Sequence, residues 1–231
     1  MFSLLRRPEA KSIQDIVEEI FNKLNYTSVD TGELVAIDSR VEKLMLHLDM
    51  ENTDIVRIIG IWGTGGMGKT TLARVVYGMV SNQFDACGFI PNVRDVLRNH
   101  NLLHLQKTLL NQLLMERDAN IHDVDSGVQM IKKRLCQKKI LLVLDDVNEL
   151  DQMKKLAGEN DWFGLGSRVI ITTRDKHLLM SRKVDGVYEV EGLNCDEALH
   201  LFNMKAFGKE NPTKDYLELS KAFVRYADGF L

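Results

Sequence analysis

One segment of the sequence combines glycines, a lysine and threonines at a spacing that suits the binding of a phosphate chain. Residues 63–71 read GTGGMGKTT and match the pattern G-x-x-x-x-G-K-[ST] without a gap. Glycines in such a loop let backbone N–H groups approach an anion closely, because no Cβ atom stands between them. We expect the phosphates to lie against the loop residues Gly63, Gly65, Gly66, Met67 and Gly68. The alternative is a glycine-rich turn that holds no ligand.

The residues that follow the loop supply a charge and a hydroxyl group. Lys69 would place its ammonium group near the β- and γ-phosphates of a nucleotide, and the hydroxyl group of Thr70 would bind Mg²⁺. The apolar run at residues 55–62 predicts a buried strand before the loop, and residues 69–77 predict a helix after it. The positive end of that helix dipole would point at the phosphates. A strand, this loop and a helix in succession indicate a nucleotide-binding site.

Two carboxylates end a second apolar run. Residues 140–144 are wholly apolar, and Asp145 and Asp146 follow them directly. We expect Asp145 to hold Mg²⁺ together with Thr70, although acidic residues also occur at strand ends without a ligand. Asp146 is the candidate catalytic residue, because active ATPases of this kind often place a glutamate there to polarise the attacking water. Aspartate is one methylene shorter, and a displacement of about 1 Å can cost on the order of a hundredfold in rate. The sequence therefore favours a nucleotide that is held over one that is consumed.

A single arginine follows a third apolar run. Residues 167–173 predict a strand, and Arg174 comes directly after it. Because parallel strands end at a common edge, its guanidinium group would face the same crevice and reach the γ-phosphate. The alternative is a solvated surface side chain.

Strands and helices alternate along most of the chain, which predicts an α/β fold with a doubly wound, mostly parallel sheet. The expected strands lie at residues 55–62, 89–93, 138–146, 167–173 and 187–190. The expected helices lie at residues 12–24, 39–50, 69–77, 102–115 and 128–136. Ser39 and Glu42 fit a capping box at the start of the second of these helices. After Gly192 the pattern is purely helical, so we place a domain boundary there.

The composition fits a protein of the cytoplasm or nucleus. A net charge of −3 over 231 residues argues against recruitment of nucleic acid or of an acidic membrane surface. Cys87, Cys136 and Cys195 lie far apart and are odd in number, which argues against disulfides or a thiolate zinc site and favours buried structural thiols in a reducing compartment. No apolar run in the sequence approaches the roughly 20 residues that span a bilayer.

Six blocks of the sequence, together with their spacing, suggest a more specific assignment. They lie at residues 34–40, 60–71, 89–94, 139–147, 166–179 and 188–202. In these blocks the chain resembles the nucleotide-binding (NB-ARC) region of plant intracellular immune receptors. The paired aspartates and the run Thr172-Thr173-Arg174-Asp175 are typical of the receptors that carry an N-terminal TIR domain.

The resemblance implies a P-loop NTPase fold of the STAND class, which acts as a switch between a closed ADP form and an open ATP form with Mg²⁺. It implies that Thr71 lies near the α-phosphate, that Arg174 senses the γ-phosphate, and that Val35 covers the adenine. Family members usually have glycine at the position of Ala36, and alanine adopts a positive φ less readily than glycine.

The resemblance also implies how the chain is divided. Residues 1–29 would form the tail helix of a TIR domain and a linker, residues 30–191 the P-loop nucleotide-binding domain, and residues 192–231 the start of a small helical (ARC1-like) domain. Leu231 stands where the family has a proline that contacts the adenine.

The TIR body, the winged-helix module and the leucine-rich repeats of the family are missing from the sequence. We therefore expect a receptor fragment whose partners, besides the adenine nucleotide, are those TIR and leucine-rich-repeat regions, with self-association on activation. The alternatives are a P-loop ATPase with genuine turnover and a non-functional receptor fragment.

Overall fold

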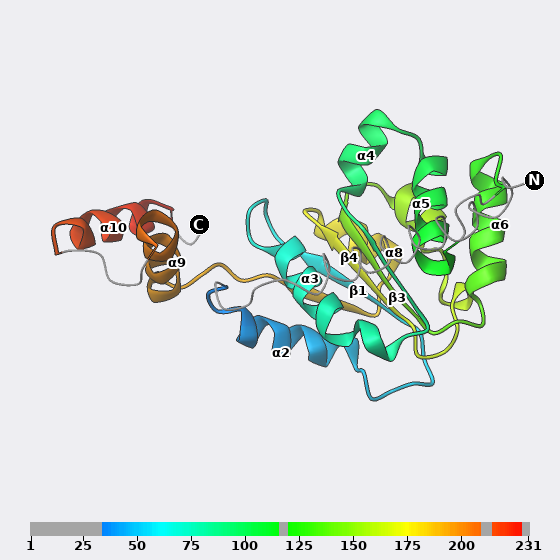
Figure 1. Cartoon of the computed structure of the whole chain (residues 1–231), viewed down its shortest axis with the longest axis horizontal. Coiled ribbons are helices and arrows are strands. Elements are labelled where there is room, and N and C mark those ends of the chain that lie inside the picture. The colour runs from blue at the N-terminus through cyan, green and yellow to red at the C-terminus, as the bar shows by residue number, and fades with distance from the viewer. Residues whose placement is uncertain (1–33, 116–119, 209–213, 228–231) are drawn as a thin grey trace, which may run out of the picture.

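A sheet of five parallel strands forms the centre of the molecule (Figure 1). The structure is a computed structural model that describes residues 34–115, 120–208 and 214–227. The expected helix at residues 12–24, and Leu231, lie outside the described residues. The strands are β1 (Arg57–Trp62), β2 (Ala86–Ile90), β3 (Ile140–Val147), β4 (Arg168–Thr173) and β5 (Gly186–Glu189), in the spatial order β2-β3-β4-β1-β5. This sheet confirms the predicted α/β fold.

Successive residues of the central strands pack into different cores on the two faces of the sheet, as the side-chain alternation of a strand requires. In β3, Leu142 and Leu144 belong to one buried cluster, whereas Leu141 and Val143 belong to the other. All four side chains are fully buried. An apolar run without polar interruptions is therefore needed here, because both faces of the strand are covered.

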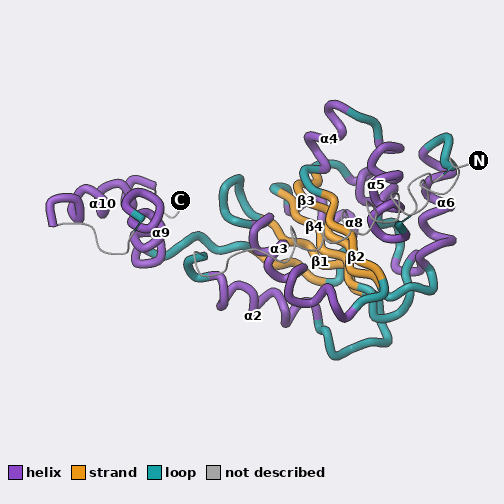
Figure 2. The backbone as a smooth tube through the Cα atoms, in the orientation of Figure 1, coloured by secondary structure: helices purple, strands orange, loops and turns teal. Residues whose placement is uncertain are grey.

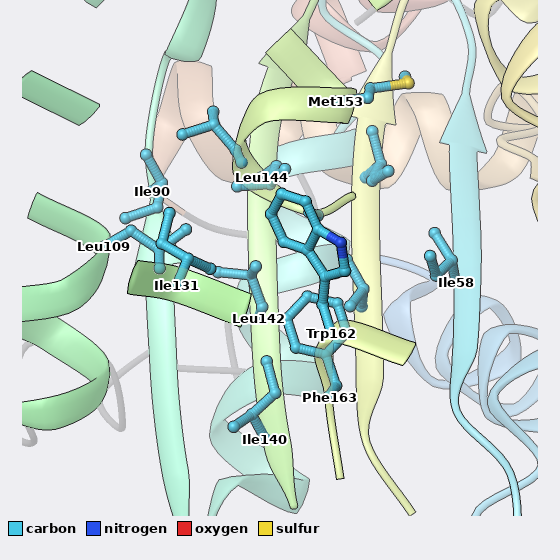
Figure 3. Close-up of a cluster of buried hydrophobic side chains, with 14 of the residues drawn as sticks. Ile58, Ile90, Leu109, Ile131, Ile140, Leu142, Leu144, Met153, Trp162 and Phe163 are labelled. Carbon is cyan, nitrogen blue, oxygen red and sulfur yellow. The ribbon is translucent and has the colours of Figure 1, made fainter. Parts of the chain in front are cut away.

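Helices cover both faces of the sheet (Figure 2). One face carries α2 (Ile37–Leu48) and α3 (Lys69–Val80), and the other carries α4 (Val93–Asn99), α5 (Leu102–Leu114), α6 (Val124–Leu135), α7 (Leu150–Leu156) and α8 (Lys176–Arg182). Short 3-10 turns lie at Ser81–Gln83 and Asn160–Trp162. On the second face Trp162 and Phe163 pack with Leu142 and Leu144 in the cluster that Figure 3 shows.

The strand order brings three strand ends together. β4 lies between β1 and β3, and its register pairs Thr173 with Trp62 of β1 and Ile171 with Leu144 of β3. The chain therefore leaves β1, β3 and β4 at one edge of the sheet, after residues 62, 147 and 173, and residues 145 and 146 belong to the last part of β3. This edge is where a ligand is expected in an open parallel sheet.

Three predicted element boundaries are wrong. The predicted capping box at Ser39 does not form, because α2 begins two residues earlier, after a left-handed turn at Ala36. Val93 was expected in a strand but is the first residue of α4; β2 ends at Ile90, and the chain turns through Asn92 in the left-handed region. The helix expected at residues 128–136 begins at Val124, because Asp123 and Ser126 form a capping box there.

Two further helices follow the sheet. They are α9 (Cys195–Phe207) and α10 (Lys214–Ala227), which pack against each other through aromatic side chains. The rings of Phe202 and Phe223 stack with their centroids 5.8 Å apart. Figure 1 shows this pair set apart from the sheet and joined to it by an extended segment. Among the described residues, none of the helices combines the length and the apolar character needed to cross a membrane.

Arg168, the first residue of β4, is a buried cation that the sequence did not single out. Its side chain is 1% exposed, and its guanidinium group donates hydrogen bonds to backbone carbonyls only. They include Leu48 at 2.6 Å, Asn52 at 2.7 Å and Ile55 at 3.1 Å. Arg168 thus fixes the segment between α2 and β1, and with it the approach of the chain to the glycine loop.

We expect Arg168→Met to lower the free energy of unfolding by about 3 kcal/mol, because several buried carbonyls lose a charged donor. The measurement is urea unfolding of the purified chain. Arg98→Met is the matched control; Arg98 is an exposed residue of α4 paired with Asp95 at 3.3 Å, so its loss should cost less than about 0.5 kcal/mol. Equal stability of the two variants would contradict the role of Arg168.

Candidate functional site

The glycine loop joins β1 to α3, and α3 begins at Lys69 as predicted. Gly66 and Gly68 have φ values of 85° and 79°, in the left-handed region that side chains other than glycine rarely adopt. A Cβ atom added at either position would meet nothing within 4 Å. These two glycines are therefore required by the turn of the backbone. Gly65 differs, because a Cβ atom there would lie 3.1 Å from the Nη1 atom of Arg174.

Lys69 is buried inside its own loop. Its side-chain Nζ donates to the carbonyl oxygens of Gly63 at 2.8 Å and of Thr64 at 2.6 Å, and the residue is 7% exposed. Burial, followed by the nearby positive charge of Arg174, holds the pKa of Lys69 below its ordinary value. An anion bound in the loop would stabilise the charged form of this buried lysine.

A fully buried carboxylate links the loop helix to the centre of the sheet. Oδ1 of Asp145 accepts hydrogen bonds from the hydroxyl groups of Thr70 and Thr172, each at 2.7 Å. The contact with Thr70 brings together the two residues expected to bind Mg²⁺. Oδ2 of Asp145 is buried and has no hydrogen-bond partner among the described residues. An uncompensated buried carboxylate oxygen is costly, so a hydroxyl group and a carboxylate in this arrangement fit a divalent cation.

Asp146 lies at an irregularity of β3. Its φ is 56°, and the pairing of β3 with β4 shifts register between Leu144 and Val147. Its backbone N–H donates to Oγ1 of Thr172 at 2.8 Å. The carboxylates of Asp145 and Asp146 thus contact different partners, and the left-handed backbone at Asp146 was not predicted from the sequence.

The carboxylate of Asp146 makes two ion pairs. Oδ2 lies 2.8 Å from Nη2 of Arg94, and Oδ1 lies 3.3 Å from Nε of Arg174. Arg174 leaves the end of β4, and its guanidinium group lies beside Gly65 of the loop. The structure therefore brings the predicted γ-phosphate sensor to the loop, but already paired with the predicted catalytic residue.

Sequence reasoning assigned no role to Arg94. The residue belongs to α4, a helix of seven residues that was not predicted. The available signal was its membership of the block at residues 89–94, which carries part of the family resemblance.

The remaining predicted residues lie at the borders of the site. Thr71 is half-buried in the first turn of α3, and Met67 packs at the edge of the core that α2 and α3 share. Val35 is half-buried in the turn that leads into α2, and α2 packs against α3. The structure therefore places Val35 on the helix layer that contains the loop helix.

Comparison with known proteins gives the family. The NB-ARC domain matches residues 37–212. The chain belongs to the NB-ARC domain family. It is 44% identical over 225 residues to disease resistance protein RPV1 of Vitis rotundifolia, covering 96% of this chain and 16% of that protein. It is 42% identical over 232 residues to TMV resistance protein N of Nicotiana glutinosa, covering 96% of this chain and 20% of that protein. The chain thus spans a fifth or less of the length of these relatives, and the matches confirm the resemblance stated from the sequence.

Solved structures support the fold alone. CDC6P from Pyrobaculum aerophilum matches with a TM-score of 0.61 at 13% identity, over 82% of this chain and 54% of that one. Drosophila ORC bound to DNA matches with a TM-score of 0.59 at 12% identity, over 88% of this chain and 54% of that one. At this identity the likeness shows the α/β fold and no more.

The backbone at Ala36 has the strain that its residue type predicts. Its φ is 57° and its ψ 25°, so an alanine occupies the left-handed region immediately before α2. We expect Ala36→Gly to raise the free energy of unfolding by about 1 kcal/mol, because glycine adopts this conformation without a steric penalty. Thermal unfolding is the measurement.

The control for this variant is Ala222→Gly, at an exposed position within α10, where glycine should destabilise the helix by about 1 kcal/mol. Effects of the same sign in the two variants would count against strain at Ala36.

Proposed function

We propose that the chain is the nucleotide-binding switch module of a plant disease resistance receptor, and that it binds ADP or ATP together with Mg²⁺. The observation that carries this proposal is the combination of Lys69 inside the glycine loop with the Thr70–Asp145 hydrogen bond beside it. Family membership and relatives named as resistance proteins support the wider role.

Each part of the site has a distinct task in this proposal. The loop amides from Gly63 to Gly68 surround the β-phosphate, and Lys69 exchanges its carbonyl partners for phosphate oxygens. Thr70 and Asp145 hold Mg²⁺, which neutralises the phosphate charge. Thr71 lies near the α-phosphate, Arg174 contacts the γ-phosphate, and Val35 covers the adenine.

The surroundings of Asp146 favour retention of the nucleotide over its hydrolysis. Its two carboxylate oxygens are committed to arginines, and the side chain is only 15% exposed. A general base must be free to accept a proton from the attacking water. We therefore propose at most slow hydrolysis, with Asp146 as its tentative catalytic residue.

Steady-state ATP hydrolysis tests the alternative of a turnover ATPase. A rate much faster than about one turnover per minute, abolished in Lys69→Ala, would support that alternative and contradict a switch that retains its nucleotide.

Contacts of α2 join it to the segment after β5 and to α9. Arg40 of α2 donates to the backbone carbonyl of Gly192 at 3.2 Å and lies 3.3 Å from the carboxylate of Glu197 in α9. We place the domain boundary between residues 191 and 192, at this contact.

In the parent receptor the proposed partners are the TIR and leucine-rich-repeat regions, with self-association on activation. The cytoplasm or nucleus is the proposed location, since Cys136 and Cys195 are free cysteines. Both are exposed, so the expectation of buried thiols is wrong for these two residues.

We expect Lys69→Ala to weaken ADP binding at least about tenfold in the presence of Mg²⁺, because a charged hydrogen bond to phosphate is lost. Isothermal titration calorimetry measures the affinity, and a thermal melt without nucleotide should stay nearly unchanged. Lys133→Ala, which removes an exposed lysine of α6, is the control and should bind ADP normally. Unchanged ADP affinity in Lys69→Ala would refute the proposed phosphate site.

We expect Arg174→Ala to weaken ATP binding about tenfold and ADP binding less than about threefold, because only ATP carries the phosphate that this arginine contacts. Lys176→Ala is the control. Lys176 lies two residues further along and covers the ring of Trp62 at 4.6 Å, so its loss should not distinguish the two nucleotides. Equal losses for ATP and ADP in Arg174→Ala would contradict a γ-phosphate sensor.

A further inference from the structure

One carboxylate at the site is shared by two arginines from separate parts of the fold. Arg94 comes from α4, at the carboxyl end of β2, and Arg174 follows β4. Each binds a different oxygen of Asp146, at 2.8 Å and 3.3 Å respectively. The trio carries one net positive charge, and removal of any member changes the charge that a third phosphate would meet.

Arg94 is the fixed member of this trio. Val93, the residue before it, is fully buried in the core and anchors the start of α4. The side chain of Arg94 is 23% exposed, and its Nε lies 3.7 Å from the carboxylate of its neighbour Asp95. The shorter contact, to Asp146, points Arg94 toward the end of β3.

Arg174 is the member that can change partner. Its side chain is 51% exposed, its ion pair with Asp146 is the longer of the two, and it lies beside Gly65 of the loop. A carboxylate and a terminal phosphate are alternative acceptors for the same guanidinium donors. To contact a third phosphate, Arg174 has to give up part of its pairing with Asp146.

We propose that Arg94 is a positioning residue that sets the preference of the site for ATP over ADP by neutralising Asp146. With Arg94 in place, Asp146 holds Arg174 weakly and repels the third phosphate little. Without Arg94, the full carboxylate charge retains Arg174 and opposes that phosphate. The inference rests on the proposed function, since it concerns the same nucleotide site.

A double-mutant cycle tests whether Arg94 acts through Asp146. The four proteins are the full 231-residue chain, Arg94→Ala, Asp146→Asn and the double variant. Calorimetry with Mg²⁺ gives the affinity for ADP and for a non-hydrolysable ATP analogue, and the quantity compared is their ratio. Arg98→Ala is the matched control, because Arg98 is on the same helix but pairs with Asp95.

We expect Arg94→Ala to lower the ratio of analogue to ADP affinity about fivefold, with ADP affinity nearly unchanged. Asp146→Asn should raise the ratio, and Arg94→Ala should have less than about a twofold effect in the Asp146→Asn background. Arg98→Ala should leave the ratio unchanged. If Arg94 only supported the fold, its replacement would change the stability of the chain and leave the ratio of the two affinities unchanged.

The outcomes separate this inference from the proposed function. If Arg94→Ala changes the affinity ratio equally with and without Asp146→Asn, Arg94 acts directly on the phosphate and the inference is wrong. An unchanged or raised ratio in Arg94→Ala would likewise overturn the inference. In each case the switch module itself would stand. Absence of any nucleotide binding by the unmodified chain would overturn both. If Arg94→Ala does not unfold cooperatively, Arg94→Lys is measured in its place, together with Asp146→Asn. A ratio of analogue to ADP affinity that is lower in Asp146→Asn than in the unmodified chain would contradict the inference.

Discussion

The arrangement of the site depends on one buried carboxylate oxygen. Oδ1 of Asp145 accepts hydrogen bonds from Thr70 at the start of α3 and from Thr172 near the end of β4. These contacts join the loop helix, β3 and β4, so the elements that supply the phosphate loop, the acidic pair and Arg174 keep a fixed relation to one another. The other oxygen of Asp145 is left buried without a hydrogen-bond partner among the described residues, at the position where a divalent cation would be stabilised.

Positive charge is concentrated around this carboxylate. Lys69, Arg94 and Arg174 lie near Asp145 and Asp146, and Arg94 also lies 3.7 Å from the carboxylate of Asp95. Burial lowers the pKa of Lys69, and the positive charge of Arg174 lowers it further. A bound polyphosphate would add negative charge beside these cations and give the lysine better acceptors than the loop carbonyls. In the proposed function the same arrangement disfavours hydrolysis, because the carboxylate that would polarise water is already paired with two arginines.

The sequence predicted the parts of the site that depend on local pattern. The loop at residues 63–68, the helix start at Lys69 and the acidic end of β3 follow from residue types and spacing alone. The pairing of Arg94 with Asp146 was not predictable in this way, because it joins separate elements through a bulge in β3. The buried Arg168 was missed for a related reason, since its acceptors are backbone carbonyls.

The same distinction applies to the helices. The helices α4, α7 and α8 contain seven residues each, too few for a helical period to stand out from the sequence. The start of α2 was misplaced because the backbone turn at Ala36 decides it, whereas the polar pattern at Ser39 suggested a later start.

The most direct test is a crystal structure of the chain grown with ADP and Mg²⁺. The account predicts a β-phosphate held by the loop amides, with Nζ of Lys69 moved from the carbonyls of Gly63 and Thr64 to phosphate oxygens, and a cation beside Asp145 and Thr70. A loop that contains only solvent at saturating nucleotide, with Lys69 still bound to those carbonyls, would contradict it.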